Sequence, residues 1–216
     1  SGHLSEADCL YENKELLNIM KLGKPFGIKD LNIIDEGFIP GEAGSIFMDD
    51  EGVLPGKTYL IRNGILNSRL HSRETACKMN EALTGNARAL DTSFQPIVRM
   101  TNTYIDKGPY SFRQILDSVE DGVYALDYNG GQTNLEMFTF SAGRAYRIQN
   151  GKIKDIFKNV TLSGNVFETL FNIEMIGDDL KFHGGLGGCG KGGQSPLPVS
   201  TGAPHVKVKN ILIGGV

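Results

Sequence analysis

Residues 145–156 read AYRIQNGKIKDI, in which two partly apolar runs flank the step Asn150-Gly151. An Asn-Gly step between two such runs predicts a β-hairpin, because both central residues of the favoured two-residue turn need a positive φ angle. A second step of this kind, Asn63-Gly64, lies between the apolar residues 59–61 and 65–66. Hairpins thus outnumber plausible βαβ crossovers, and we expect a strand-rich α+β fold with mostly antiparallel sheets and a few helices.

Further elements are expected on both sides of these hairpins. Apolar runs and alternation predict strands at 31–35, 123–128, 136–140 and 206–213, with a turn at 129–131. Helical spacing and capping signals predict helices at 6–20, 73–83, 111–119 and 166–173. The succession of a hairpin and then a helix occurs twice, which would fit an internal duplication.

The composition is that of a globular protein. Of the 216 residues, 40% are hydrophobic and 22% are charged. The net charge is −3 and the sequence contains no cluster of lysines or arginines, which argues against binding to duplex nucleic acid or to an anionic membrane. The sequence also contains neither an apolar stretch of about 20 residues nor a signal-peptide pattern, so we expect a soluble, cytoplasmic protein.

The most unusual segment is 184–194, which reads GGLGGCGKGGQ. It resembles a phosphate-binding P-loop, but Gly192 stands where that motif needs Ser or Thr. The glycines are expected to leave the Cys189 thiol exposed, and Lys191 beside it would favour the thiolate. Cys189 is therefore a candidate nucleophile or metal ligand. Nucleophilic use requires a base, for which the sequence offers His3, His71, His183 and His205.

Metal binding by Cys189 would require further ligands. His3 is of interest because Glu6 and Asp8 follow it closely. The acidic run 49–51 lacks the spaced oxygen ligands of an EF-hand loop and is more typical of a solvated turn. The other cysteines, Cys9 and Cys77, lie on predicted helices and are expected to pack as small hydrophobic residues.

Several short motifs occur in the order of a known family. They are Gly2-His3-x-x-Glu6-x-Asp8, 47–52 (FMDDEG), 64–66 with 70–73, 84–88 (TGNAR), 99–103 (RMTNT), 130–132, 164–165 and Cys189-Gly190-Lys191-x-Gly193-Gln194. Together they resemble the C-terminal part of the TldD/PmbA family, once called modulators of DNA gyrase. The family has a branch of TldD-like zinc metallopeptidases and a branch of PmbA/TldE-like partners, and the cysteine motif resembles the first branch.

The resemblance implies a zinc site. In TldD-like chains the two histidines of an H-E-x-x-x-H helix and a later cysteine hold zinc, and the glutamate of that helix acts as the base. By position, His3 matches the second histidine and Cys189 matches the cysteine. The first histidine and the glutamate would lie upstream of His3, so this sequence supplies no catalytic residue. We therefore expect 1–216 to be a C-terminal metallopeptidase domain without its N-terminal domain, and inactive alone.

The resemblance also implies small or unfolded peptides as substrates, which could add as a strand to a sheet edge. Candidates for the substrate-binding lining are Arg99, Asn102, Gly131, Gln132 and Gln194, for which structural roles are equally open. For His71 and Arg73 we expect helix capping or a surface ion pair, and for His183 and His205 structural or exposed positions.

The partner implied by the resemblance is a TldD/PmbA family subunit in a homo- or hetero-oligomer. Two alternatives remain open for the chain itself. It could be a noncatalytic PmbA/TldE-like partner or scaffold, in which Cys189 is structural, or a thiol-dependent enzyme that uses Cys189 as its nucleophile.

Overall fold

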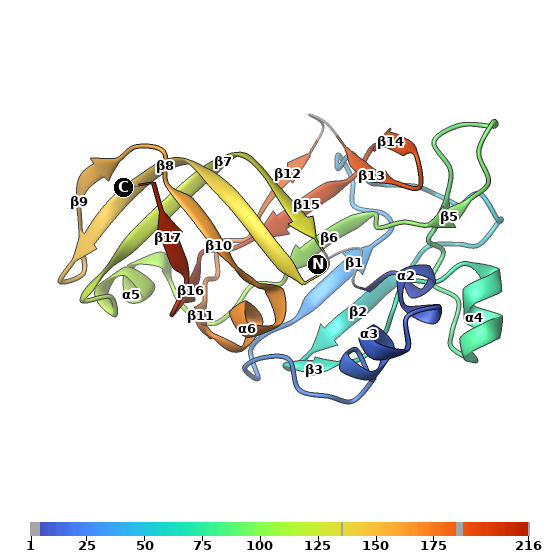
Figure 1. Cartoon of the computed structure of the whole chain (residues 1–216), viewed down its shortest axis with the longest axis horizontal. Helices are drawn as coiled ribbons and strands as arrows, with labels where there is room; N and C mark the ends of the chain where they lie inside the picture. The colour runs from blue at the N-terminus through green and yellow to red at the C-terminus, as the bar shows by residue number, and fades with distance from the viewer. Residues whose placement is uncertain (1–4, 135, 185–187, 216) are drawn as a thin grey trace. The chain divides into compact units, whose positions relative to one another are not determined.

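The computed structural model describes residues 5–134, 136–184 and 188–215, and Figure 1 shows the order of their helices and strands. The chain divides into two compact units. The first comprises Leu31–Asp106, Leu180–Ala203 and the N-terminal residues up to Pro25. The second comprises Phe26–Asp30, Lys107–Asp179 and the residues from Pro204 onward. Antiparallel sheets predominate in both, which confirms the predicted α+β class.

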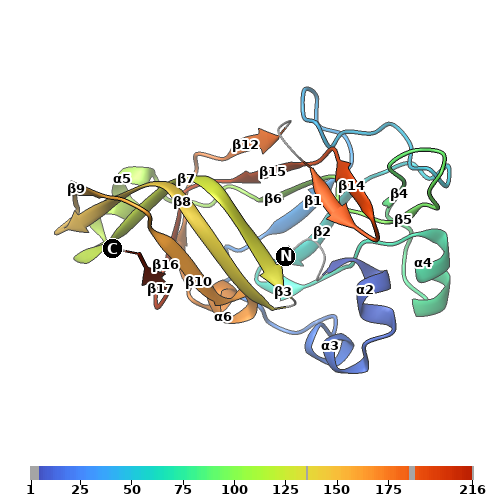
Figure 2. The same ribbon diagram turned by 45° about the horizontal axis from the view of Figure 1, so that its top comes forward.

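The first unit is built on a six-stranded sheet. Its strands, in spatial order, are β12 (Lys181–Gly184), β15 (Ser200–Ala203), β6 (Asn102–Ile105), β1 (Ile33–Glu36), β2 (Lys57–Arg62) and β3 (Ile65–Leu66). Strand β15 pairs parallel to β6, and the other described pairs are antiparallel (Figure 2). The hairpin β2–β3 confirms the Asn63-Gly64 turn, since φ is 51° at Asn63 and 76° at Gly64.

The described residues of the first unit form three short helices: α2 (Ala7–Tyr11), α3 (Lys14–Ile19) and α4 (Arg73–Met79). The predicted single helix over 6–20 is wrong, because Asn13 adopts an extended conformation and its side chain caps α3 by accepting from the Leu16 amide. Helix α4 begins with a capping box between Ser72 and Thr75. It ends earlier than predicted, since Asn80 adopts the left-handed conformation.

Two small hairpins complete the first unit. One pairs β4 (Ala87–Arg88) with β5 (Ile97–Val98), and the other pairs β13 (Cys189–Lys191) with β14 (Gln194–Leu197). Apolar side chains with at most 2% of their surface exposed form the core of this unit: Leu10, Leu31, Ile34, Leu60, Leu66 and Leu70. These residues hold the helices and the sheet on which the candidate site is built.

The second unit contains a five-stranded antiparallel sheet. Its strands are β7 (Asp121–Asn134), β8 (Met137–Gln149), β9 (Lys152–Phe157), β10 (Thr161–Asn165) and β17 (Leu212–Gly214). The unit also contains α5 (Phe112–Asp117), α6 (Val166–Phe171) and the pair β11 (Ile173–Ile176) and β16 (Val206–Val208). The hairpin β8–β9 confirms the Asn150-Gly151 turn, and a capping box between Ser111 and Gln114 starts α5 as expected.

Two expectations for the second unit are wrong. The predicted turn at 129–131 lies inside β7, where the register shifts between Tyr128 and Gly130 and the strand continues to Asn134. A β-bulge accommodates the glycines without reversing the chain. The predicted strand over 206–213 is divided into β16 and β17, which belong to different sheets, and Asn210 between them has a φ of 57°. None of the described helices is long and apolar enough to cross a membrane.

Candidate functional site

Cys189 lies at the start of the hairpin β13–β14 in the first unit, opposite Leu197. Gly192 and Gly193 form the turn with positive φ angles of 57° and 76°. At Gly188 a Cβ atom would lie 2.5 Å from the Leu197 carbonyl oxygen, so only glycine fits there. The expectation of an exposed thiol is wrong, because Cys189 is buried with 9% of its surface exposed. Gly188 thus allows close backbone packing beside the cysteine, and Gly192 and Gly193 form the turn.

The Arg99 side chain binds both strands of this hairpin. It has no exposed surface, and its Nη2 atom donates to the carbonyl oxygens of Cys189, at 2.6 Å, and Gln194, at 3.3 Å. These two carbonyls belong to different strands, so one guanidinium joins both strands of the hairpin. The Nε and Nη1 atoms of Arg99 have no hydrogen-bond partner among the described residues. Burying a cation with unpartnered donors costs free energy, which the contacts of Arg99 with both strands of the hairpin help to offset.

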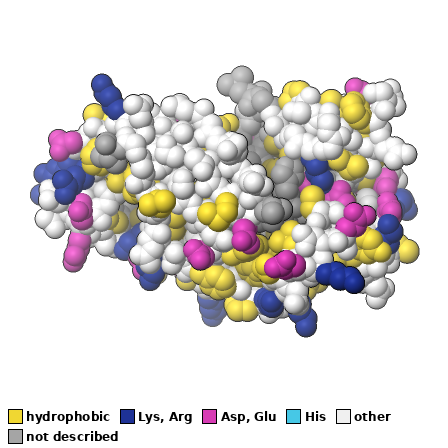
Figure 3. Space-filling model, viewed as in Figure 1, with side chains coloured by type: hydrophobic (Ala, Val, Ile, Leu, Met, Phe, Trp, Pro, Cys, Tyr) yellow, Lys and Arg dark blue, Asp and Glu magenta, His cyan; other side chains and the backbone are white. Residues whose placement is uncertain are grey.

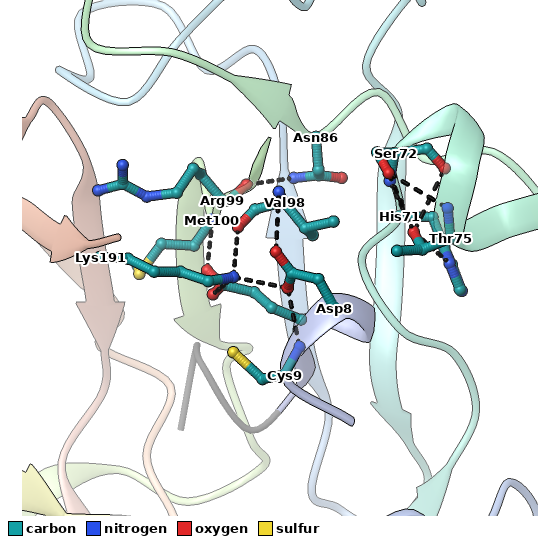
Figure 4. A network of polar contacts seen from close by, with 11 residues as sticks. Asp8, Cys9, His71, Ser72, Thr75, Asn86, Val98, Arg99, Met100 and Lys191 are labelled. Carbon is teal, nitrogen blue, oxygen red and sulfur yellow. Dashed lines mark hydrogen bonds and ion pairs between the residues drawn. The ribbon is translucent and has the colours of Figure 1, made fainter. Parts of the chain in front are cut away.

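Lys191 ties the hairpin to helix α2 and strand β5. Its Nζ atom donates to Glu6 Oε2 at 2.7 Å, Asp8 Oδ1 at 2.6 Å and the Val98 carbonyl oxygen at 2.8 Å (Figure 4). Burial lowers the pKa of Lys191, but the attraction of the two carboxylates outweighs burial and the net effect is a raised pKa. The ammonium group therefore stays charged and neutralises part of the acidic pair.

The two carboxylates also bind the chain around β5. The Met100 amide donates to Glu6 Oε1 at 3.0 Å, and the Val98 amide donates to Asp8 Oδ2 at 3.3 Å. Glu6 has no exposed surface. The start of α2, strand β5 and the Cys189 hairpin are thus linked in one polar network, of which Figure 4 shows the central part.

Glu6, Asp8 and Cys9 are a group of metal-competent side chains, with ligand atoms within 4.8 Å of one another. The ammonium of Lys191 already lies between the two carboxylates, and it would have to leave before a cation could take its place. Burial is the largest cause that raises the pKa of the Cys9 thiol, which disfavours the thiolate that a metal needs. As it is arranged here, this group fits a lysine and not a metal ion. Cys9 is half-buried, whereas Cys77 is exposed, contrary to the expectation of a packed position.

A second polar layer supports the segment 99–103. Asp35, on β1, is buried and accepts from the Thr101 amide at 2.8 Å and from the hydroxyls of Thr101 and Thr103 at 2.6 and 2.7 Å. It also accepts from Asn86 Nδ2, which donates in addition to the Arg99 carbonyl oxygen. The motif at 99–103 indicated this region, but no sequence pattern pointed to Asp35 as its partner.

The predicted substrate-binding residues lie in different parts of the fold. Asn102 is fully buried on β6 and donates to the Glu36 carbonyl oxygen, and Gln194 on β14 binds the backbone of Leu90 and Gln95. The structure brings Gln194 and Arg99 together, whereas Gly131 and Gln132 lie on β7 of the second unit. The bonds of Arg99, Asn102 and Gln194 account for structural roles, and substrate contact stays a prediction. His3 lies outside the described residues.

The acidic run at 49–51 is a structural turn. Asp49 is buried and accepts from the amides of Glu51, Val53 and Ala87. Glu51 accepts from the Arg73 amide at the start of α4. On the face drawn in Figure 3, acidic and basic side chains are interspersed, in agreement with the absence of a basic cluster in the sequence.

The histidines differ in their surroundings. His71 is buried, and its ring contacts Thr75 Oγ1 at 3.1 Å and Glu81 Oε2 at 3.0 Å, which differs from the expected surface ion pair. His183 is exposed on β12. His205 belongs to the second unit and contacts Tyr124 and Asp179 there.

A family model described as the PmbA/TldA metallopeptidase C-terminal domain matches residues 1–215. The chain belongs to this family. Within the PmbA/TldA family it is 52% identical to a metalloprotease of Synechocystis sp. over 214 residues, which cover 99% of this chain and 46% of the relative. It is 36% identical to a zinc metalloprotease TldD homolog of Saccharolobus solfataricus over 217 residues, or 99% of this chain and 47% of that protein. The chain thus spans less than half the length of these curated relatives.

Solved structures of PmbA/TldA relatives have the same fold. A candidate modulator of DNA gyrase from Thermotoga maritima superimposes with a TM-score of 0.78 at 27% identity, over 98% of this chain and 45% of that one. TldE from Thermococcus kodakarensis also gives a TM-score of 0.78, at 22% identity, over 98% and 46% of the two chains. The latter likeness concerns the fold alone.

Proposed function

We propose that residues 1–216 are the C-terminal domain of a zinc-dependent, cytoplasmic peptidase that cleaves small or unfolded peptides. The observation that carries this proposal is the contact of Lys191 with Glu6 and Asp8. Lys191 is two residues from Cys189, and Glu6 is three residues from His3. The contact therefore joins the two sequence segments that contain the proposed metal ligands.

The donor chemistry of these segments fits zinc. A thiolate and an imidazole are the side chains that zinc prefers in proteins, and a catalytic site uses three protein ligands and leaves a fourth position open. Cys189 and His3 would supply two of them, and a histidine upstream of His3 would supply the third. When bound, zinc would activate a water molecule and polarise the peptide carbonyl.

The residues of this chain would orient the ligands. Arg99 holds the Cys189 carbonyl oxygen, and Lys191 holds the start of α2. Both contacts are made by buried or largely buried cations, so they restrict the motion of the hairpin and of the helix start. A metal site tolerates little displacement of its ligands, and such supporting contacts tune affinity and activity.

The edge of the first unit's sheet favours a peptide as substrate. Among the described residues, strand β12 pairs with β15 on one side and has no neighbour on the other. It ends at Gly184, five residues before Cys189. An extended peptide that pairs with this edge would be bound through its main chain, with little selection of side chains. A TldE-like subunit is the proposed partner, in a homo- or hetero-oligomer.

The test uses the full-length parent protein and a disordered peptide substrate. We expect hydrolysis and bound zinc, measured by mass spectrometry of the products and by elemental analysis, to be lost together in Cys189→Ser and after treatment with a zinc chelator. Cys77→Ser, at an exposed cysteine, should retain both. Full activity and full zinc content in Cys189→Ser would contradict the ligand assignment. Activity that resists the chelator but is lost on alkylation would favour the thiol-dependent enzyme instead.

A further inference from the structure

The second unit contains a cavity of about 710 Å³. It lies between the sheet, α5 and the segment 204–213, and every residue that lines it belongs to this unit. Pockets that bind small molecules have volumes of about 300–1,000 Å³ and are mainly apolar, with a few converging polar groups. The size of this cavity is thus sufficient for a ligand, and the nature of its walls indicates which kind.

Most of the walls are apolar and come from three parts of the unit. The sheet contributes Phe140 and Leu162, helix α5 contributes Ile115 and Leu116, and the C-terminal segment contributes Ile213. Phe140, Leu162 and Ile213 also pack against the buried core of this unit, so these walls are fixed in place. Such surfaces favour an apolar ligand, because binding removes apolar area from water.

Three rings that line the cavity form a cluster, and two of them, Tyr124 and His205, belong to a polar group. The ring centroids of Phe112 and His205 are 4.3 Å apart, those of Phe112 and Tyr124 5.4 Å, and those of Tyr124 and His205 5.5 Å. Helix α5 follows directly on Ser111, whose capping box fixes the start of the helix and with it Phe112. A cluster of rings at these spacings favours a flat ring compound.

The polar group is a chain of three side chains. Asp179 accepts from the His205 amide at 3.0 Å through Oδ1, and its Oδ2 lies 2.5 Å from His205 Nδ1. Tyr124 Oη lies 2.7 Å from His205 Nε2. Burial raises the pKa of Asp179, but the hydrogen bonds from His205 outweigh burial and lower it, so the carboxylate is ionised.

The ionised carboxylate can only accept hydrogen bonds, so His205 Nδ1 carries a proton and donates to Asp179. The other ring nitrogen, Nε2, contacts Tyr124 Oη. Whichever of these two atoms donates, the phenolic oxygen keeps a lone pair that can accept a hydrogen bond. The group thus offers an acceptor to a ligand.

The charged residues that line the cavity already have partners. Asp121 pairs with Arg147 and Asp127 pairs with Arg144. Lys207 and Lys209 both pair with Glu174, at 3.2 and 3.1 Å. A charged ligand would have to compete with these pairs, whereas a neutral ligand would not.

We propose that this cavity binds a neutral, mainly apolar ring compound that donates one hydrogen bond to the phenolic oxygen of Tyr124. This site lies in a different unit from Cys189 and does not depend on a metal. Tyr124 is its specificity-determining residue, because it distinguishes a ring that carries an N–H or O–H group from one of equal shape that does not.

Indole and benzofuran are suitable probes, since they have nearly the same shape and only indole carries a donor. In a titration of the 216-residue chain followed by methyl NMR, both probes should shift the signals of Leu162 and Ile213 and leave those of Leu60 and Leu66 unchanged. Indole should bind about fivefold more tightly, the effect of one net hydrogen bond.

Two variants separate the contribution of the hydrogen bond to affinity from that of the apolar walls. Tyr124→Phe should abolish the preference for indole and leave the affinity for benzofuran unchanged. Tyr128→Phe, at an exposed tyrosine of the same strand outside the cavity, should retain the preference. The proposal is overturned if neither probe shifts the Leu162 and Ile213 signals, if both bind equally to the unmodified chain, or if the preference persists in Tyr124→Phe.

Discussion

The Nζ atom of Lys191 lies 2.7 Å from Oε2 of Glu6, a carboxylate that has no exposed surface. Removal of one partner from a buried ion pair leaves an uncompensated charge, which costs about 3–5 kcal/mol. We expect Lys191→Met to lower the free energy of unfolding by about 3 kcal/mol, measured by urea denaturation. Combining it with Glu6→Gln should restore part of the loss.

An exposed pair in the same unit provides the control. Lys78 pairs with Glu74 at 2.6 Å, with exposed side-chain fractions of 43% and 69%. Because water screens such pairs, Lys78→Met should change the free energy of unfolding by less than about 0.5 kcal/mol. An equal effect of Lys78→Met and Lys191→Met would contradict the structural role assigned to Lys191.

Loss of the Arg99 guanidinium should loosen the hairpin that contains Cys189. Since hydrogen bonds to a charged group contribute about 1.5–3 kcal/mol, we expect Arg99→Met to increase the rate of Cys189 alkylation by at least about tenfold. Peptide mass spectrometry after iodoacetamide labelling measures the rate, with the exposed Cys77 as an internal reference. Arg113→Met, at an exposed arginine of the second unit, should leave both rates unchanged. Unchanged alkylation of Cys189 in Arg99→Met would show that the guanidinium does not restrain it.

Gly85 and Gly52 allow a matched test of close packing. Both have left-handed φ angles, +72° and +76°. A Cβ at Gly85 would lie 2.6 Å from the Pro55 Cα atom, whereas a Cβ at Gly52 would meet no atom within 4 Å. Gly52→Ala should lower the free energy of unfolding by only about 1 kcal/mol, which is the cost of a Cβ in the left-handed conformation. Gly85→Ala should cost about 2 kcal/mol more in thermal or urea unfolding, and equal costs would contradict this packing.

The buried ring of His71 makes stability depend on pH. Burial lowers the pKa of His71 in the folded chain below the usual histidine value of about 6.5, so the unfolded chain binds a proton more readily. The contribution of His71 to the free energy of unfolding is therefore present above about pH 6.5, and it is lost as the pH falls through the lower pKa of the folded chain. We expect the free energy of unfolding to fall between pH 7.5 and about 5.5, by at most about 1.4 kcal/mol per pH unit from this residue.

The variant His71→Gln should show a smaller fall over the same range, measured by urea denaturation at several pH values. His183→Gln, at an exposed histidine, should match the unmodified chain. A pH dependence that is the same in His71→Gln and in the unmodified chain would rule out His71 as its source.

Short-range signals in the sequence predicted much of the fold. The Asn63-Gly64 and Asn150-Gly151 turns and the Ser111 capping box depend on neighbouring residues, and the structure confirms all three. The helix break at Asn13 comes from a local cap that the apolar spacing did not indicate. The continuous strand β7 depends on pairing with β8, which outweighs local preference. A one-residue change of register at Tyr128 was enough to absorb the glycines that had suggested a turn.

The candidate site was less accessible to sequence reasoning. The motifs marked Cys189, Lys191 and Arg99 as unusual, but the partners of the Lys191 and Arg99 side chains are 90 or more residues away along the chain. Local composition suggested an exposed thiol, because a run of glycines is typical of open backbone. In the structure Gly188 lets the Leu197 backbone approach closely, and Cys189 beside it is buried.

The parallel pairing of β6 and β15 has a consequence for biosynthesis. Residues 107–179 of the second unit are inserted between these two neighbouring strands of one sheet. During translation, β6 emerges from the ribosome long before its partner, and its edge stays open until residue 203 has been synthesised. Nascent chains with unpaired strand edges are prone to aggregate, so this topology exposes the growing polypeptide to aggregation until β15 has been synthesised.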